Sequence, residues 1–287
     1  MLLVPRTCQP HSQPEDGRPD MPVPLDETRG FAAYALLGDP GSGKSKAFEQ
    51  EAAASGTEPI SAGDFLGLDH PELQNASSPI FIDGLDEMRA GTSNGTLPLD
   101  GIRKKLQQLG CRRFRISCRA ADWLGQPDVQ RLQSMLPAGE QVQVFTLQPL
   151  TVADVAAILP SNHAITDPQA FIASAEQHGL TDLLFNPQTL GMLAAAVGPE
   201  NRWPETRLAV YEMACERLVQ EHNEEHVAAT RKTAPDQGQL LRATAYLCAI
   251  QLIADLAGFT HSPNSSDRVL RLNAVPNSEG LPLGEAL

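Results

Sequence analysis

The segment GDPGSGKS, residues 38–45, limits the fold of this chain more than any other part of its sequence. An apolar run at 31–37 precedes it, and a pattern typical of a helix follows it from Lys44. The spacing G-x-x-x-x-G-K-[ST] between such flanks predicts a buried strand, a glycine-rich turn and a helix. We call residues 38–45 the glycine loop, and we expect an α/β fold around it.

The residue types in the glycine loop suit a phosphate group. Its glycines allow the main chain to turn N–H groups inward, and the helix that follows adds partial positive charge. Lys44 would neutralise the β- and γ-phosphates, and the Ser45 hydroxyl would bind Mg²⁺. The candidate nucleotide-binding residues are therefore the whole loop: Gly38, Asp39, Pro40, Gly41, Ser42, Gly43, Lys44 and Ser45. The alternative is a glycine-rich turn with a surface lysine.

Short apolar runs alternate with helical patterns along the first half of the chain, which predicts parallel strands joined by helices on both faces of a sheet. The expected strands lie at 31–37, 58–65, 79–83, 114–118 and 142–147. If the usual order of nucleoside triphosphatases applies, these strands are arranged 2-3-4-1-5. The predicted fold class is a three-layer αβα P-loop NTPase with a parallel five-stranded sheet.

Three acidic residues cluster directly after the apolar strand at 79–83, in the sequence FIDGLDE. Asp83 ends the strand, so its carboxylate can share an edge of the sheet with the glycine loop and bind Mg²⁺, commonly through water. Either Asp86 or Glu87 can orient or deprotonate the water that attacks the γ-phosphate. The alternative is a solvated acidic turn that caps a helix.

Arg119 follows the strand FRISC at 114–118. In the expected strand order this strand lies between the glycine-loop strand and the acidic strand, so its carboxyl end faces the γ-phosphate. Arg119 could sense or stabilise that charge. The alternative is a surface arginine in a segment that contains several others.

The sequence predicts four parts. Residues 1–28 contain six prolines among polar residues and predict a disordered lead-in. Residues 29–150 form the α/β domain. Thr151 and Asp154 fit a capping box, and no convincing strand follows for a long stretch, so a helical segment at 151–202 and a further helical region at 203–287 are expected.

Composition limits the partners and the compartment. The net charge of −13 repels phosphate backbones and anionic lipid, so we expect no nucleic-acid partner and no membrane. The five cysteines form no CxxC pair, which suits reduced thiols. No apolar run approaches the roughly eighteen residues of a membrane span, and no signal peptide is found. A cytoplasmic protein is expected.

Five segments together resemble NACHT-type members of the STAND signal-transduction NTPases, which are related to AAA+ proteins and include many bacterial antiviral defence sensors. FIDGLDE is the most specific of them, and the resemblance spans roughly residues 30–220. The segments are GDPGSGKS (38–45), FIDGLDE (81–87), FRISCR (114–119), FTLQPLTVADVAAIL (145–159) and LLFNPQTLGML (183–193).

The resemblance implies that residues 151–202 are a helical lid, with Pro187 against the adenine, and that 203–287 hold an incomplete winged-helix domain. It implies a switch that rests with ADP, exchanges to ATP and oligomerises when a trigger is sensed. Members usually carry an effector domain before the NTPase and a sensor region after it. The chain would therefore be truncated, or would work with itself and with separate effector or sensor proteins.

Two functions fit these residues. The first is a Mg²⁺-dependent ATPase that hydrolyses slowly and whose nucleotide state controls assembly. The second is an interaction module that binds nucleotide without hydrolysing it and uses the lid as an adaptor surface. A small-molecule kinase is a third, for which we find no substrate-binding insertion, and GTP could replace ATP.

Overall fold

A computed structural model describes most of the chain. It covers residues 2–11, 21–74, 77–90, 98–110, 113–198, 202–204, 206–221, 236–256, 258–260, 269–277 and 279–284. The chain divides into two compact units: the first is Met1–Gln169 with Thr181–Leu190, and the second is Ala170–Leu180 with Gly191–Leu287. The glycine loop and every candidate site residue belong to the first unit.

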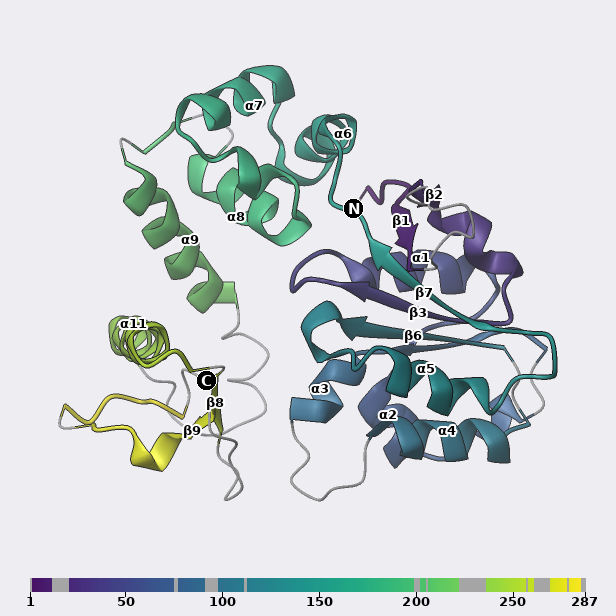
Figure 1. Cartoon of the computed structure of the whole chain (residues 1–287). Helices are drawn as coiled ribbons and strands as arrows, with labels where there is room; N and C mark the ends of the chain where they lie inside the picture. The colour runs from purple at the N-terminus through teal and green to yellow at the C-terminus, as the bar shows by residue number, and fades with distance from the viewer. Residues whose placement is uncertain are drawn as a thin grey trace. The chain divides into compact units, whose positions relative to one another are not determined.

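In the described residues, the first unit contains a seven-stranded sheet with the order β2-β1-β7-β3-β6-β5-β4 (Figure 1). The strands are β1 (Thr7–Pro10), β2 (Val23–Pro24), β3 (Ala33–Gly38), β4 (Ile60–Ser61), β5 (Ile80–Asp83), β6 (Phe114–Arg119) and β7 (Val142–Leu147). The strands from β3 to β7 are parallel, and their order agrees with the predicted 2-3-4-1-5. The predicted count of five strands is wrong, because β1 and β2 add antiparallel pairing beside β7.

Helices cover both faces of the sheet, as an α/β fold requires (Figure 1). α1 (Lys44–Ala54) packs on one face through Ala47, Phe48 and Ala52. The other face is covered by α2 (Ala62–Gly67), α3 (Leu85–Ala90), α4 (Pro98–Gln108) and α5 (Gln126–Gln133). Short 3₁₀ helices connect these elements at η2 (Pro71–Leu73) and η3 (Ala120–Asp122).

The central strand β3 is buried on both faces, as its continuous apolar sequence predicts. Ala33, Ala35 and Leu37 belong to the core under α2 to α5, whereas Tyr34 and Leu36 belong to the core under α1. Burial of each such leucine contributes about 1.5–3 kcal/mol. The strand that carries the glycine loop is therefore held firmly from both sides.

The strand predicted at 58–65 is wrong over most of its length. Only Ile60–Ser61 forms a strand beside β5, and helix α2 begins at Ala62. The reason is local, because the Ser61 hydroxyl accepts a hydrogen bond of 3.0 Å from the Asp64 N–H and so caps the helix. The edge of the sheet at β4 is consequently short.

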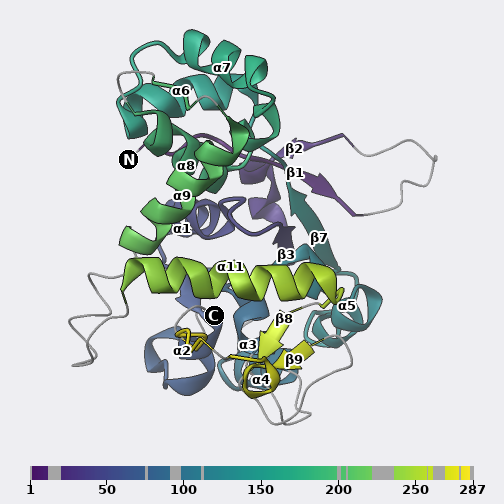
Figure 2. The same ribbon diagram turned by 90° about the vertical axis from the view of Figure 1, so that its left-hand side faces the viewer.

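The expectation of a disordered lead-in over 1–28 is wrong for the described residues 7–10 and 23–28. β1 pairs with β7, and β2 pairs with β1 (Figure 2). The 3₁₀ helix η1 (Leu25–Gly30) follows. Prolines do not prevent this pairing. The His11 N–H donates to Val144 O at 2.8 Å, so in the antiparallel alternation the missing N–H of Pro10 lies on the side away from β7.

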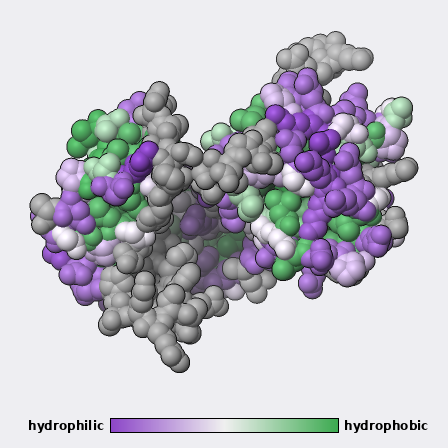
Figure 3. All heavy atoms as spheres, turned by 90° about the horizontal axis from the view of Figure 1, so that it is seen from below, coloured by the Kyte–Doolittle hydropathy of each residue, from purple (hydrophilic) through white to green (hydrophobic). Residues whose placement is uncertain are grey.

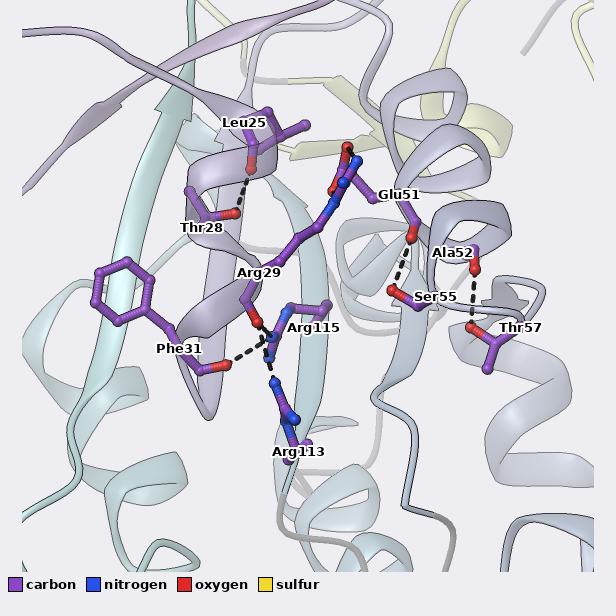
Figure 4. Close-up of polar contacts among 10 residues, drawn as sticks. All are labelled: Leu25, Thr28, Arg29, Phe31, Glu51, Ala52, Ser55, Thr57, Arg113 and Arg115. Atoms are coloured by element: carbon purple, nitrogen blue, oxygen red, sulfur yellow. Dashed lines mark hydrogen bonds and ion pairs between the residues drawn. The ribbon is translucent and has the colours of Figure 1, made fainter.

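Arg115 of β6 fastens the segment after η1 to the sheet (Figure 4). Its side chain is 1% exposed and donates to Phe31 O at 2.6 Å and to Arg29 O at 3.3 Å. The guanidinium also lies 4.5 Å from the centre of the Tyr34 ring. Arg29 in turn pairs with Glu51 of α1 at 2.6 Å. A buried guanidinium is stable only when its donors are bonded, so these contacts order the end of η1 and the residues that lead into β3.

Helices follow the sheet in the chain. α6 (Val152–His163) begins with the predicted capping box: the Thr151 N–H donates to the Asp154 carboxylate at 2.8 Å, and the Asp154 N–H donates to the Thr151 hydroxyl at 3.2 Å. The next helices are α7 (Pro168–Gln177), η4 (Thr181–Leu184) and α8 (Pro187–Val197). The two compact units do not divide the chain at 151 or 203, so the four-part division stays a prediction.

The second unit contains α9 (Arg207–Glu221), α11 (Gln237–Ile253) and the 3₁₀ helix η5 (Leu272–Ala274). It also contains a parallel pair of short strands, β8 (Gly258–Thr260) and β9 (Val269–Arg271). Its core includes the buried side chains Ala243, Leu247, Leu272, Val275 and Leu283. The prediction of a helical region over 203–287 is therefore wrong at β8 and β9.

Hydrophilic side chains cover much of the face drawn in Figure 3, and patches of hydrophobic side chains lie between them. Among the described residues, the most exposed large hydrophobic side chains are Leu252 and Ile253 of α11, at 82% and 87%. None of the described helices has both the length and the apolar character that crossing a bilayer requires.

Cys8 tests whether β1 is ordered in solution. Its thiol is fully buried, and burial raises its pKa to about 12, whereas Cys215 and Cys248 are exposed. In the folded protein at about pH 8, we expect iodoacetamide to modify Cys8 at least about 100-fold more slowly than Cys215, as followed by peptide mass spectrometry. The same reaction in denaturant is the control. Equal rates for Cys8 and Cys215 in the folded protein would contradict a buried β1.

Candidate functional site

The glycine loop joins β3 to α1 at the carboxyl end of the central strand. Gly41 and Gly43 have φ of 70° and 89°, a conformation that residues with a side chain rarely adopt. Gly38 is restricted by space, since a Cβ there would lie 2.7 Å from Ser42 Oγ. That hydroxyl is buried, and the described residues offer it no hydrogen-bond partner. The loop is closely wound and holds a polar group that a ligand could satisfy.

The carbonyl oxygens of the five successive residues 38 to 42 each accept a hydrogen bond. Lys44 supplies the first two donors: its Nζ donates to Gly38 O at 2.8 Å and to Asp39 O at 3.0 Å. Asp39 O also accepts from the Ser42 N–H at 3.2 Å. The lysine side chain therefore folds back over the turn that precedes its own helix.

The start of α8 supplies the next two donors. Asn186 Nδ2 donates to Pro40 O at 3.0 Å, and the Gln188 N–H donates to Gly41 O at 3.3 Å. The Gln188 side chain also lies on Gly41, where a Cβ would come within 2.2 Å of Gln188 Oε1. A side chain at Gly41 is thus excluded by space as well as by φ.

Arg6, which precedes β1, supplies the fifth donor. Its Nη1 donates to Ser42 O at 2.9 Å, and its Nη2 donates to Gln148 O at 2.6 Å. Burial lowers the pKa of Arg6, and the negative charge of Asp154 opposes that change. The guanidinium thus connects the glycine loop to the residue that follows β7.

These bonds determine where the loop amides point. In a trans peptide the carbonyl and the following N–H point in opposite directions. Asn186 holds the carbonyl of Pro40 and Arg6 holds that of Ser42, so the N–H group of each following residue points away from that donor. Those N–H groups belong to Gly41 and Gly43.

The N-terminus of α1 adds positive charge beside these amides. Its N-cap, Gly43, has no side chain to accept from the first N–H groups, and its first turn contains no acid. Burial lowers the pKa of Lys44, which Asp86 raises and Arg119 lowers to smaller extents. A lysine at the positive end of an uncapped helix is unfavourable alone and favourable with a bound anion.

Asp83 lies where the sequence predicts, at the carboxyl end of β5, and is half-buried. Ser117 of the adjacent strand β6 donates a hydrogen bond from Oγ to Asp83 Oδ1 and accepts one of 2.9 Å from the Gly84 N–H. Gly84 has φ of 79° and so turns the chain out of the strand. Ser117 therefore fixes both the carboxylate and the turn that follows it.

Asp86, in the first turn of α3, is buried, and both of its carboxylate oxygens contact Arg119. Oδ2 lies 2.8 Å from Arg119 Nε, and Oδ1 accepts from the Arg119 N–H at 3.0 Å. Arg119 ends β6, which lies between β3 and β5 as predicted, and its side chain is 50% exposed. Asp86 therefore fixes the orientation of Arg119.

Glu87 is exposed although it is the neighbour of Asp86 in α3. Its carboxylate folds back over the turn, since a Cβ at Gly84 would lie 3.1 Å from Glu87 Cδ. The two acids that the sequence leaves as alternatives thus differ in environment. Asp86 is engaged in an ion pair, and Glu87 lies in contact with solvent near the end of β5.

The remaining predicted residues lie around the glycine loop. Pro187 packs beside Gly43, with its Cγ 3.4 Å from the position of a Cβ there, and its contact with adenine stays a prediction. Ser45 is exposed in the first turn of α1. In the described part of the chain, no group of three or more His, Cys, Asp or Glu side chains could hold a metal ion. Mg²⁺ here would depend on phosphate and water oxygens besides Ser45 and Asp83.

Sequence reasoning missed four residues of this site: Arg6, Ser117, Asn186 and Gln188. Arg6 was hidden in the segment expected to be disordered. Ser117 carries no signal of its own, since a serine in an apolar strand is common. Asn186 and Gln188 flank Pro187, and only the fold places them on the loop.

A scan of protein-family models gave no match to this chain, and a search of curated proteins gave no significant match.

A double-mutant cycle on Asp86 and Arg119 tests the ion pair. We expect Asp86→Asn and Arg119→Met to couple by about 1 kcal/mol in urea unfolding, because half-exposure of the arginine weakens a contact to a buried carboxylate. The control pair is Lys46 and Glu49, 2.7 Å apart and 54% and 45% exposed, for which at most about 0.5 kcal/mol is expected. Equal coupling in the two pairs would contradict the assignment.

Proposed function

We propose that this chain binds ATP or ADP with Mg²⁺ in the glycine loop and acts as a cytoplasmic switch of the NACHT-type STAND class that hydrolyses ATP slowly. One observation carries the proposal. The carbonyls of residues 38–42 are all held by donors, and those on Pro40 and Ser42 turn the N–H groups of Gly41 and Gly43 away from Asn186 and Arg6, next to the positive end of α1. A phosphate group has the charge and the acceptor atoms that such a site binds.

Lys44 supports the same proposal. Burial lowers its pKa, and its Nζ donates only to neutral carbonyls among the contacts described here. A phosphate charge beside it would stabilise the protonated form. The ammonium group, which already lies over the turn, could donate to a phosphate oxygen with a small movement of a flexible side chain.

Ser45 and Asp83 would hold Mg²⁺ in this proposal. Ser45 lies in the first turn of α1, which begins at the carboxyl edge of the sheet, and Asp83 lies at the end of β5 on the same edge. Ser117 keeps the Asp83 carboxylate in place. When bound, the metal neutralises charge on the β- and γ-phosphates. An oxygen-only set with few carboxylates suits Mg²⁺, which retains water and phosphate ligands.

Of the two acids after β5, Glu87 suits the handling of water better. Both oxygens of Asp86 are occupied by Arg119, and Asp86 is buried. Glu87 is exposed and lies on the turn at Gly84. We therefore assign the orientation of the attacking water to Glu87 and the positioning of Arg119 to Asp86.

The start of α8 offers a route from nucleotide to lid. Asn186 and Gln188 donate to loop carbonyls, and Pro187 packs on Gly43, so a change in the loop alters these contacts first. We propose that exchange of ADP for ATP changes this contact and so exposes surfaces for self-association or for a separate effector or sensor protein. A role in bacterial antiviral defence rests on the resemblance in the sequence.

The non-hydrolysing adaptor remains the second candidate because of one observation. Both oxygens of Asp86 contact Arg119, so Asp86 cannot act on water, and Arg119 Nε cannot reach a γ-phosphate, without rearrangement. If this pair stays closed with nucleotide bound, the chain would bind ATP as a structural element.

Nucleotide binding tests the core of the proposal. With Mg²⁺ present, we expect a fluorescent ATP analogue to bind the wild-type chain and to bind Lys44→Ala roughly 10- to 100-fold more weakly, because a charged hydrogen bond to phosphate is lost. The matched control is Lys46→Ala, two residues away, whose side chain is exposed and pairs with Glu49. No binding to wild type, or equal binding to both variants, would contradict a nucleotide site in the loop.

Hydrolysis distinguishes the switch from the adaptor. We expect Glu87→Gln to lower the single-turnover rate of phosphate release by about 100-fold or more while nucleotide affinity stays near that of wild type, since only water handling is removed. Glu49→Gln, an exposed acid of α1, is the control for loss of surface charge. A wild-type chain that binds ATP but releases no phosphate would favour the adaptor.

A further inference from the structure

Arg6 occupies a position that the proposed nucleotide chemistry does not by itself explain. It lies in the lead-in, before β1, yet its guanidinium joins the carbonyl of Ser42 in the glycine loop to the carbonyl of Gln148 after β7. These two acceptors lie 106 residues apart in the sequence, and neither belongs to β1, the strand that Arg6 precedes. The two-pronged fork of an arginine matches two separate acceptors in a way that a lysine cannot.

We infer that Arg6 is a positioning residue for nucleotide in the glycine loop, and that through it β1 controls how well the loop binds phosphate. The inference rests on the proposed nucleotide site. It adds a residue outside the GDPGSGKS segment and makes Arg6, together with β1, part of the binding machinery.

The peptide group between Ser42 and Gly43 carries the effect. Arg6 Nη1 donates to the carbonyl of this group at 2.9 Å, so the N–H of Gly43 is directed away from Arg6. The charged donor also polarises the peptide, which makes its N–H a better donor to a phosphate oxygen. Gly43 must be glycine for this approach, since a Cβ there would lie 2.9 Å from Arg6 Nη1.

The main chain around Arg6 is itself fixed, so the side chain acts from a rigid base. Arg6 O accepts from the Leu25 N–H at 2.8 Å, and Thr7 O accepts from the Gln148 N–H at 2.9 Å. β1 then continues along β7 in antiparallel register (Figure 2). Any displacement of β1 from β7 would withdraw the guanidinium from the loop.

Amide exchange and nucleotide affinity, measured on the full chain, test this inference. In nucleotide-free Arg6→Met, we expect hydrogen exchange of the Ser42 amide, which donates to Asp39 O within the loop, to rise about ten-fold while exchange over β7 stays as in wild type, and affinity for Mg²⁺-ATP to fall about ten-fold. Arg6→Lys keeps the charge but not the fork and should lie between the two. The matched control is His11→Ala, next to β1, whose ring contacts Thr146 of β7 at 2.5 Å.

Each result decides the matter. Unchanged loop exchange and affinity in Arg6→Met would overturn the inference. An equal rise in hydrogen exchange over the loop and over β7 would make Arg6 a general contact of the fold and would also overturn the inference. Hydrogen exchange and affinity in Arg6→Lys that both equal those of wild type would overturn it too. If wild type fails to bind Mg²⁺-ATP, the proposed function fails, and this inference, which depends on a nucleotide site, is overturned with it. If wild type binds but Arg6→Met binds equally well, only this inference fails.

Discussion

The hydrogen bonds to the carbonyls of residues 38–42 are the constraint on which the rest of this site depends. A turn rich in glycine has many conformations open to it, and here each carbonyl is held by a donor from Lys44, the start of α8 or Arg6. The parallel pairing of β3 with β7 contributes to this, because it brings the ends of both strands to one edge, where Arg6 joins them. The single conformation of the loop thus depends on the tertiary fold, and only partly on the loop's own residues.

Two arginines join the amino-terminal part of the chain to the sheet, Arg115 at the start of β3 and Arg6 at the ends of β3 and β7. Arg115 donates to carbonyls that precede β3, and Arg6 donates to carbonyls that follow β3 and β7. Both use a buried or half-buried guanidinium whose donors are satisfied by main-chain oxygens, which is the condition for placing this group inside a protein. Together they fix the residues just before β3 and the glycine loop just after it.

The three acids at and after the end of β5 show how environment separates residues of similar chemistry. Asp83 is fixed by Ser117, Asp86 is paired with Arg119, and Glu87 faces solvent. Burial and pairing make one of them a metal-ligand candidate, one an anchor for a cation and one a candidate for handling water. Close spacing in sequence therefore does not imply a shared role.

The sequence by itself determined the strand, glycine loop and helix, and the capping box at Thr151, because each follows from local patterns of apolar, glycine and capping residues. The order of the five parallel strands was predicted from the usual order of nucleoside triphosphatases, and the sheet has that order. It did not determine that Ser61 would end β4 after two residues, or that β1 would join β7. Only the tertiary structure decided the roles of Arg6, Ser117, Asn186 and Gln188. Their contacts join segments far apart in the chain, and the hydrogen bonds that define them exist only once the sheet has brought those segments together.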